Sequence, residues 1–139
     1  MNKIILASHG EFSQGLKQTA SMIIGDEGNI FALSAFRDED EPIKSQVEHL
    51  LEEIGHDDVY ILTDIFGGSV NNDLLMIQKE HQEVHLLAGM NLPLVISIAT
   101  QTEKIKSDQL TTIIEESRQG IIDCKQLLVT EINIGGDDL

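Results

Sequence analysis

The stretch KIILASHG, residues 3–10, decides the fold. Its first six residues form a compact and mostly apolar run of strand length, and a histidine and a glycine follow at once. An apolar run of this kind is typical of a strand that is buried on both faces of a parallel sheet. The stretch therefore predicts a first strand over residues 3–8, followed by a loop that carries His9 and Gly10.

Helical and strand-like segments alternate along the rest of the chain. Further strands are predicted at 29–35, 58–63, 83–88 and 126–133. Helices are predicted at about 12–24, 43–54, 70–80, 92–100 and 107–122. Strands separated by helices imply right-handed crossovers, so we expect an α/β fold. The expected architecture is a doubly wound, mainly parallel five-stranded sheet in the order 2-1-3-4-5, with helices on both faces.

Length and charge limit the functions that need to be considered. A chain of 139 residues suits one compact domain, expected over 1–134, and the last residues, 135–139, are expected to form a loose tail. The formal net charge of −15 argues against nucleic-acid binding; it favours a basic protein partner, or only solubility. A single cysteine excludes an internal disulfide framework. The short apolar N-terminal run fits neither a signal peptide nor a membrane span, so a cytoplasmic location is expected.

The sheet order predicts where the chemistry lies. In this order the chain reverses direction between the first and third strands, and ligands bind beyond the C-terminal ends of the strands at that point. The loop after the first strand carries His9, and the loop after the third strand begins with Asp64. A carboxylate that accepts one imidazole N–H fixes the tautomer and makes the other nitrogen a better nucleophile. We therefore expect His9 to accept a phosphoryl group, through Nε2, while Asp64 orients the ring.

A phosphoryl group on this histidine would also need hydrogen-bond donors. Gly67, Gly68 and Ser69 precede the helix predicted at 70–80, and a helix N-terminus favours an anion. Glycines leave main-chain N–H groups accessible, so these three residues and Gly10 are the expected phosphoryl-binding residues. Each feature alone has a plainer explanation as a turn or a cap, and only their joint placement points to a site.

Three motifs, in this order along the chain, resemble those of one known family. They are ILASHG at 5–10, DIFGGS at 64–69 and AGMNLPL at 88–94. Together they resemble the IIA domains of the mannose-type (mannose/fructose/sorbose) bacterial sugar phosphotransferase system, over about residues 3–130. One departure is Val70-Asn71, where the family often has Pro and Phe, and it affects the expected details of the rim around the site.

The resemblance implies a set of roles and partners. The family's phosphorylated histidine falls on His9, and the aspartate that hydrogen-bonds it falls on Asp64. The implied phosphate donor is the phosphocarrier protein HPr, and the implied acceptor is a separate IIB subunit, which serves the membrane permease subunits IIC and IID. The chain would then be a phosphotransferase at the periphery of a membrane complex. The resemblance also implies an antiparallel last strand and a homodimer formed by exchange of that strand, here residues 126–133.

Some residues and functions remain as weaker candidates. Phe66, Met90, Asn91 and Leu92 are expected to form a rim on which a partner docks. No cofactor and no metal site is expected, since no set of ligands among the other four histidines converges in sequence. The alternatives are a receiver-like regulatory domain phosphorylated on Asp64, a flavin-binding module, and a phosphotransfer subunit of a dihydroxyacetone kinase. The chain lacks the paired acids that a receiver needs after the first strand. Only 4% of its residues are aromatic, which argues against a flavin site. The Ser-His-Gly sequence at 8–10 favours the sugar phosphotransferase domains over the dihydroxyacetone kinase subunit.

Overall fold

The computed structural model describes residues 1–36 and 41–133, so the predicted tail at 135–139 lies outside the described residues. The chain begins with β1 (Lys3–His9), α1 (Phe12–Ile24), β2 (Ile30–Ala35), α2 (Ile43–Ile54) and β3 (Val59–Thr63). It continues with α3 (Ser69–Glu80), β4 (His85–Ala88), α4 (Leu92–Ala99), α5 (Ser107–Arg118) and α6 (Cys124–Asn133). The predicted alternation of strands and helices is confirmed as far as α4.

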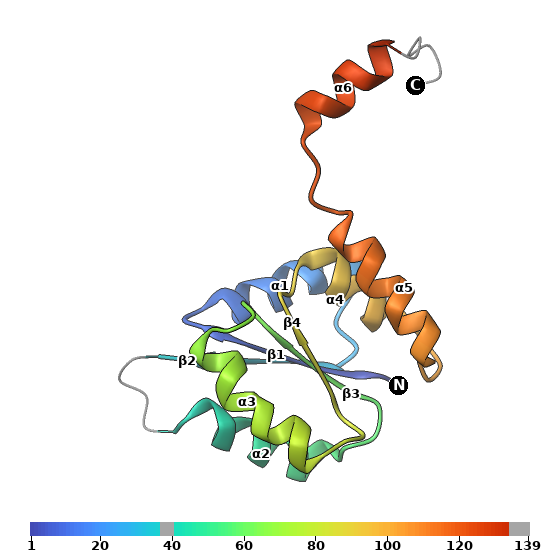
Figure 1. The fold of residues 1–139 in the computed structure, drawn as a ribbon. Coiled ribbons are helices and arrows are strands. Elements are labelled where there is room, and N and C mark those ends of the chain that lie inside the picture. Colours follow the sequence, from blue (N-terminus) through green and yellow to red (C-terminus); the bar gives the residue numbers. More distant parts are fainter. Residues whose placement is uncertain (37–40, 134–139) are drawn as a thin grey trace.

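The four strands form one parallel sheet in the order β2-β1-β3-β4 (Figure 1). The α/β class and the relative order of the first four strands are therefore as predicted. In the register of the central pair, Ala7 lies opposite Thr63, and on the other side of β1 His9 lies opposite Ala35. This register brings the C-terminal ends of β1 and β3 to the same edge of the sheet.

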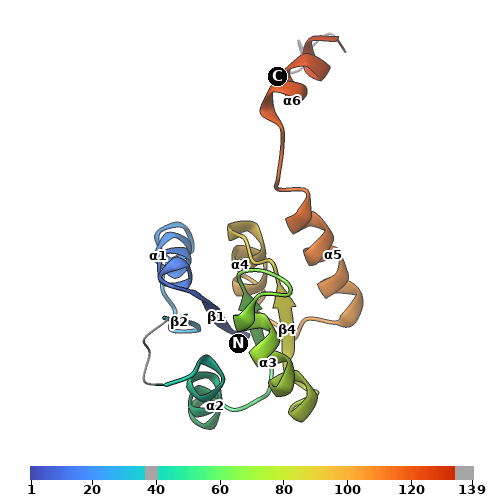
Figure 2. The same cartoon turned by 60° about the vertical axis from the view of Figure 1, so that its left-hand side comes forward.

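Helices cover both faces of the sheet, and each face has its own core. Side chains alternate along β1, so Ile4 and Leu6 enter one core while Ile5 and Ala7 enter the other. The first core is closed by α1, α4 and α5, and the second by α2 and α3 (Figures 1 and 2). Such double coverage explains why the strands are apolar almost throughout.

The C-terminal segment departs from the prediction. The expected fifth, antiparallel strand over 126–133 is wrong: these residues belong to α6, which stands away from the body of the domain (Figure 1). Asp123 starts this helix, since its carboxylate accepts from the amides of Lys125 and Gln126 at 3.1 and 3.3 Å. A strand needs a neighbour for its main-chain hydrogen bonds, whereas a helix satisfies them internally, and the partly alternating apolar pattern of 126–133 did not decide between the two.

Within the described ranges, every helix is too short or too polar to cross a lipid bilayer.

Candidate functional site

His9 and Asp64 meet where the chain leaves the two central strands. His9 is the last residue of β1, and Asp64 directly follows β3. The structure thus brings together the two residues singled out from the sequence, at the sheet edge where the order reverses. The His9 side chain is 53% exposed and that of Asp64 only 13%, so the imidazole faces solvent over a largely covered carboxylate.

One oxygen of Asp64 holds His9 in two ways. The main-chain amide of His9 donates to Oδ2 at 2.9 Å, and the ring atom Nδ1 lies 2.7 Å from the same oxygen. The other oxygen, Oδ1, accepts from the amide of Ile65 at 3.0 Å. Because a carboxylate only accepts, Nδ1 carries the proton, and the lone pair of the neutral ring is therefore on Nε2.

The environment of Asp64 favours its ionised form. Burial alone raises the pKa of the Asp64 carboxyl, but the hydrogen bonds and charge of His9, helped by the amide of Ile65, outweigh it. The net effect is a pKa below the ordinary value for aspartate. A permanent negative charge therefore lies on the Nδ1 side of the imidazole.

The start of α3 faces the other side of the ring. Gly68 is the N-cap of α3, and Ser69, the first helical residue, places its Oγ 3.0 Å from Nε2 of His9. The first main-chain bond of the helix runs from the amide of Asn72 to the carbonyl of Gly68 at 2.9 Å. The amides of residues 69–71 consequently have no partner within the helix, and a helix start of this kind favours an anion.

A side chain at position 68 would crowd Ile65. A Cβ built there would lie 2.7 Å from Cγ2 of Ile65 and 3.5 Å from Cε1 of His9. The preceding Gly67 adopts a φ of +81°, which few other residues tolerate. The glycine pair therefore serves mainly to turn the backbone tightly and bring α3 up to the imidazole.

Two buried hydroxyl contacts hold the site loops, and the sequence analysis missed both. The amide of Ser13 donates to Oγ of Ser8 at 2.7 Å, which ties the start of α1 to the end of β1. Thr63 donates to Oδ1 of Asn71 at 2.7 Å, which ties α3 to the end of β3. The sequence does show a Ser or a Thr near the end of each of these strands, just before the site loop. The group that hydrogen-bonds to each hydroxyl is set only by the fold.

Three other predicted residues have different roles from those expected. The amide of Gly10 donates to the carbonyl of Ala35 at 2.9 Å, so it continues the sheet and is not free for a phosphoryl group. Met90 is only 5% exposed and belongs to the first core, which excludes it from a docking rim. Asn91 is the N-cap of α4, accepting from the amide of Leu94 at 3.0 Å.

Exposed apolar side chains do occur in the two chain segments that follow His9 and Asp64. Phe66 is 80% exposed, Ile65 58% and Phe12, the first residue of α1, 49%. Leu92 is partly buried against the first core. We call Phe12, Ile65 and Phe66 the apolar rim. The sequence analysis predicted Phe66 but missed the other two, because apolar residues at an element boundary look like core residues.

Two of the other histidines come together with a carboxylate. His56, which is distant in sequence from the other two, His81 and Glu83 place their ligand atoms within 4.8 Å of one another. His85 instead stacks on Tyr60, and His49 pairs with Glu41.

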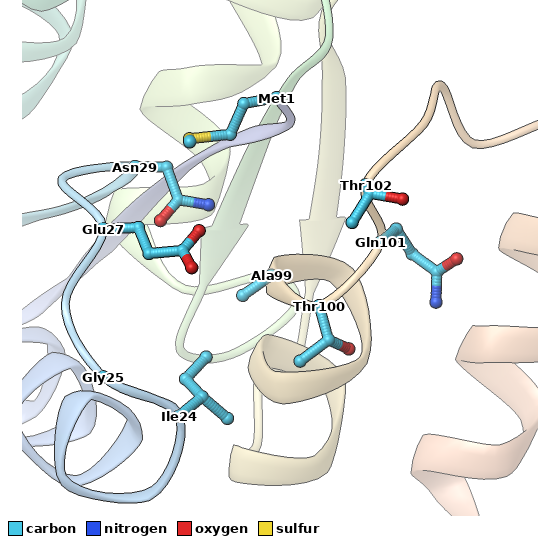
Figure 3. Close-up of a pocket in the computed structure, with 9 residues that line it drawn as sticks. All are labelled: Met1, Ile24, Gly25, Glu27, Asn29, Ala99, Thr100, Gln101 and Thr102. Carbon is cyan, nitrogen blue, oxygen red and sulfur yellow. The ribbon is translucent and has the colours of Figure 1, made fainter.

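A cavity of about 320 Å³ lies at the opposite end of the sheet from His9 (Figure 3). It is bounded by the chain before β1 and β2 and by the end of α4. Glu27 is the one carboxylate among its nine lining residues, so they do not provide the paired groups that acid–base or phosphoryl chemistry uses.

Comparison with known proteins finds one family. The model of the family EIIA-man, described as "PTS system fructose IIA component", matches residues 3–115. The fructose-specific EIIA component of Bacillus subtilis is 30% identical over 131 residues, which cover 92% of this chain and 90% of the relative. The mannose-specific EIIAB component of Escherichia coli K12 is 28% identical over 85% of this chain, but the match spans only 38% of that longer protein.

Solved structures agree with the fold. A structure from Klebsiella pneumoniae, described as a candidate permease of the phosphoenolpyruvate-dependent sugar phosphotransferase system, is 32% identical with a TM-score of 0.80. That match covers 91% of this chain and 93% of the other. The PTS IIA protein associated with the fucose utilization operon of Streptococcus pneumoniae is 26% identical with a TM-score of 0.76, over 91% of this chain and 96% of the other.

Proposed function

Because the chain belongs to the family of PTS system fructose IIA components, the mannose-type IIA domains of the sugar phosphotransferase system, we propose that His9 is its phosphoryl-carrying residue. The proposed reaction takes a phosphoryl group from HPr and passes it to a separate IIB subunit. In this role the chain is a phosphotransferase with a phosphohistidine intermediate, and it needs no cofactor.

One observation carries the proposal: the two ring nitrogens of His9 have opposite environments. Nδ1 lies 2.7 Å from the Asp64 carboxylate, and Nε2 faces Ser69 at the start of α3. The Nε2 lone pair attacks the phosphorus, a P–N bond forms, and the P–N bond to the donor imidazole breaks. The proton stays on Nδ1, so the phosphorylated ring is cationic and Asp64 balances its charge.

The helix end supports the same step. As the phosphoryl group arrives at Nε2, the Ser69 hydroxyl can turn from the ring to donate to a phosphoryl oxygen. The amides at the start of α3 lie beside it and face developing negative charge without further rearrangement. We propose Ser69 and the amides of residues 69–71 as the phosphoryl-binding groups, with Gly67 and Gly68 shaping the turn.

The apolar rim around His9 fits a protein partner. Its three side chains, Phe12, Ile65 and Phe66, are exposed and follow His9 and Asp64 closely in the chain, and the imidazole is itself half exposed. A phosphohistidine on HPr could therefore reach Nε2 without entering a cleft, and the chain's net charge of −15 favours a basic partner surface. We propose that HPr and the IIB subunit use this rim in turn, in the cytoplasm, with the IIC and IID permease subunits reached only through IIB.

We also propose that the protein is a homodimer through its C-terminal segment. Residues 121–130 are all exposed, and they include the apolar side chains of Ile121, Ile122 and Leu128. Monomeric proteins rarely leave such a stretch uncovered. A second copy of this chain would cover it.

The receiver-like alternative, with phosphate on Asp64, is not favoured by the geometry. Oδ2 of Asp64 already accepts two hydrogen bonds from His9 and Oδ1 accepts one from Ile65. These three hydrogen bonds occupy most of the lone-pair sites of the carboxylate, and its side chain is only 13% exposed to an incoming donor.

The decisive test is incubation with phosphoenolpyruvate, enzyme I and HPr, followed by mapping of the labelled residue. We expect one label on His9 that is lost in acid and retained in base, as phosphohistidine behaves. A base-labile label on Asp64, or labelling that persists in His9→Ala, would overturn the proposal.

A further inference from the structure

Two turns at the end of the sheet remote from His9 bring three possible metal ligands together. His56 lies in the turn between α2 and β3, and His81 is the residue at which α3 ends. Glu83 lies two residues further on, before β4. The rings of His56 and His81 stack with centroids 4.3 Å apart at an angle of 14°. Their Nδ1 atoms lie 3.8 and 3.9 Å from the same oxygen, Oε1 of Glu83.

We propose that His56, His81 and Glu83 form a binding site for a divalent transition-metal ion, with Zn²⁺ the best fit. The three ligand atoms all lie within 4.8 Å of one another. A tetrahedral zinc ion would hold its donor atoms about 3.3 Å apart. Small side-chain rotations would bring the three donor atoms to that spacing. The side chains can make these rotations, because they remain 39%, 28% and 48% exposed.

The donor chemistry selects the class of ion. Two imidazole nitrogens and one carboxylate oxygen suit zinc, copper, nickel or cobalt, whereas magnesium and calcium prefer oxygen ligands throughout. An imidazole ligates a metal through an unprotonated ring nitrogen. Water would fill the fourth position, on the exposed side.

The surroundings favour a cation. Glu83 also borders a neighbouring cavity whose lining includes Asp57 and Asp58, with Lys104 as the one cationic side chain among its lining residues. The local charge is therefore negative, which raises the concentration of cations near the ligands.

Binding would tie two turns of the chain together. His56 precedes β3, while His81 and Glu83 precede β4, and these two strands are neighbours in the sheet. The ion would therefore stabilise the folded state over the unfolded chain, in which the ligands are separated. Because the site lies at the opposite end of the strands from His9, it is a structural metal site and takes no part in phosphoryl transfer.

Zinc titration of the tag-free protein tests the proposal by calorimetry, by competition with a chromophoric chelator and by thermal unfolding. We expect one ion per chain and a rise of several degrees in the unfolding midpoint. His56→Ala, His81→Ala and Glu83→Gln should each weaken binding by at least about 100-fold, because even an outer-shell partner of a ligand is worth about 10- to 100-fold. Far-ultraviolet circular dichroism shows whether each variant is folded.

Three matched variants remove other groups that could bind zinc. His49→Ala removes a histidine from α2, Cys124→Ser removes the exposed thiol, and His9→Ala removes the histidine of the transfer site. All three should keep the wild-type affinity and the thermal shift. Absence of stoichiometric binding, or binding lost in a control but kept in His56→Ala, would overturn the assignment. Phosphoryl acceptance is measured separately, so failure of the metal site leaves the role of His9 standing.

Discussion

The main-chain amide and the Nδ1 atom of His9 both donate to a single oxygen of Asp64, at 2.9 and 2.7 Å. One carboxylate oxygen therefore fixes the backbone of the β1 end and the ring that projects from it. The fold therefore fixes the orientation of the His9 ring, which does not rotate freely. Nε2 is consequently presented at the start of α3 before any donor arrives.

Loss of the Asp64 charge should slow transfer without unfolding the protein. The Asp64→Asn side chain has no charge, so it no longer favours the Nδ1–H tautomer of His9 or stabilises the cationic phosphorylated ring. We therefore expect phosphoryl transfer to fall by about 10- to 100-fold. Asp73→Asn makes the same charge change on an exposed residue of α3 and should transfer at the wild-type rate. Rapid-quench measurement from phosphorylated HPr compares the two. Equal rates in both directions for Asp64→Asn would remove its orienting role.

The Ser69 hydroxyl should have a smaller effect. Its contact with Nε2 at 3.0 Å is one neutral hydrogen bond, worth about 0.5–1.5 kcal/mol. Ser69→Ala should therefore slow transfer by about 2- to 10-fold and leave stability nearly unchanged. Ser107→Ala, at the first position of α5, is the matched control. A loss in Ser69→Ala as large as in His9→Ala would mean that the hydroxyl does more than bind phosphoryl oxygens.

Gly68→Ala and Gly15→Ala should have opposite effects. The new Cβ at 68 would lie 2.7 Å from Ile65 and 3.5 Å from His9, so we expect the site loop to shift, with slower transfer and lower stability. The Cβ at 15, inside α1, meets nothing within 4 Å, and alanine is the better helix former by about 1 kcal/mol. Urea unfolding and transfer rates check both. A neutral Gly68→Ala would show that the close approach to the ring is dispensable.

The lowered pKa of Asp64 predicts how stability changes in acid. A carboxyl with a lower pKa in the folded than in the unfolded state stabilises the fold fully above its unfolded pKa of about 3.9. That contribution is lost as the pH falls through the lower folded pKa. The wild type should therefore exceed Asp64→Asn in unfolding free energy at pH 6, and the difference should shrink below about pH 4. A difference independent of pH would contradict this assignment.

Removal of the C-terminal segment should change assembly and not the fold. Among the residues whose side chains the structure describes, neither core includes one beyond 114, so a chain ending before Gln126 retains both cores. We expect the full chain to sediment as a dimer and the shortened chain as a monomer with the same circular dichroism. A shortened chain that remains a dimer would place the interface elsewhere.

The sequence by itself predicted the parallel order of the first four strands and the two residues that we propose to act together, His9 and Asp64. Apolar runs of strand length separated by helical periods permit few arrangements, since crossovers are right-handed and strands need cover on both faces. The order predicted for the first four strands, 2-1-3-4, places β1 beside β3, so the proximity of His9 and Asp64 follows once that order is chosen.

Only the tertiary structure decided which groups are free and which are engaged. The amide of Gly10 is used in the sheet and Met90 is buried, because each depends on neighbours supplied by distant parts of the chain. Cys124–Asn133 is helical because no neighbouring strand pairs with it among the described residues. The meeting of His56 with His81 and Glu83 also depends on distant parts of the chain. Residues about 25 positions apart share no sequence period, and it is the adjacency of β3 and β4 that joins their turns.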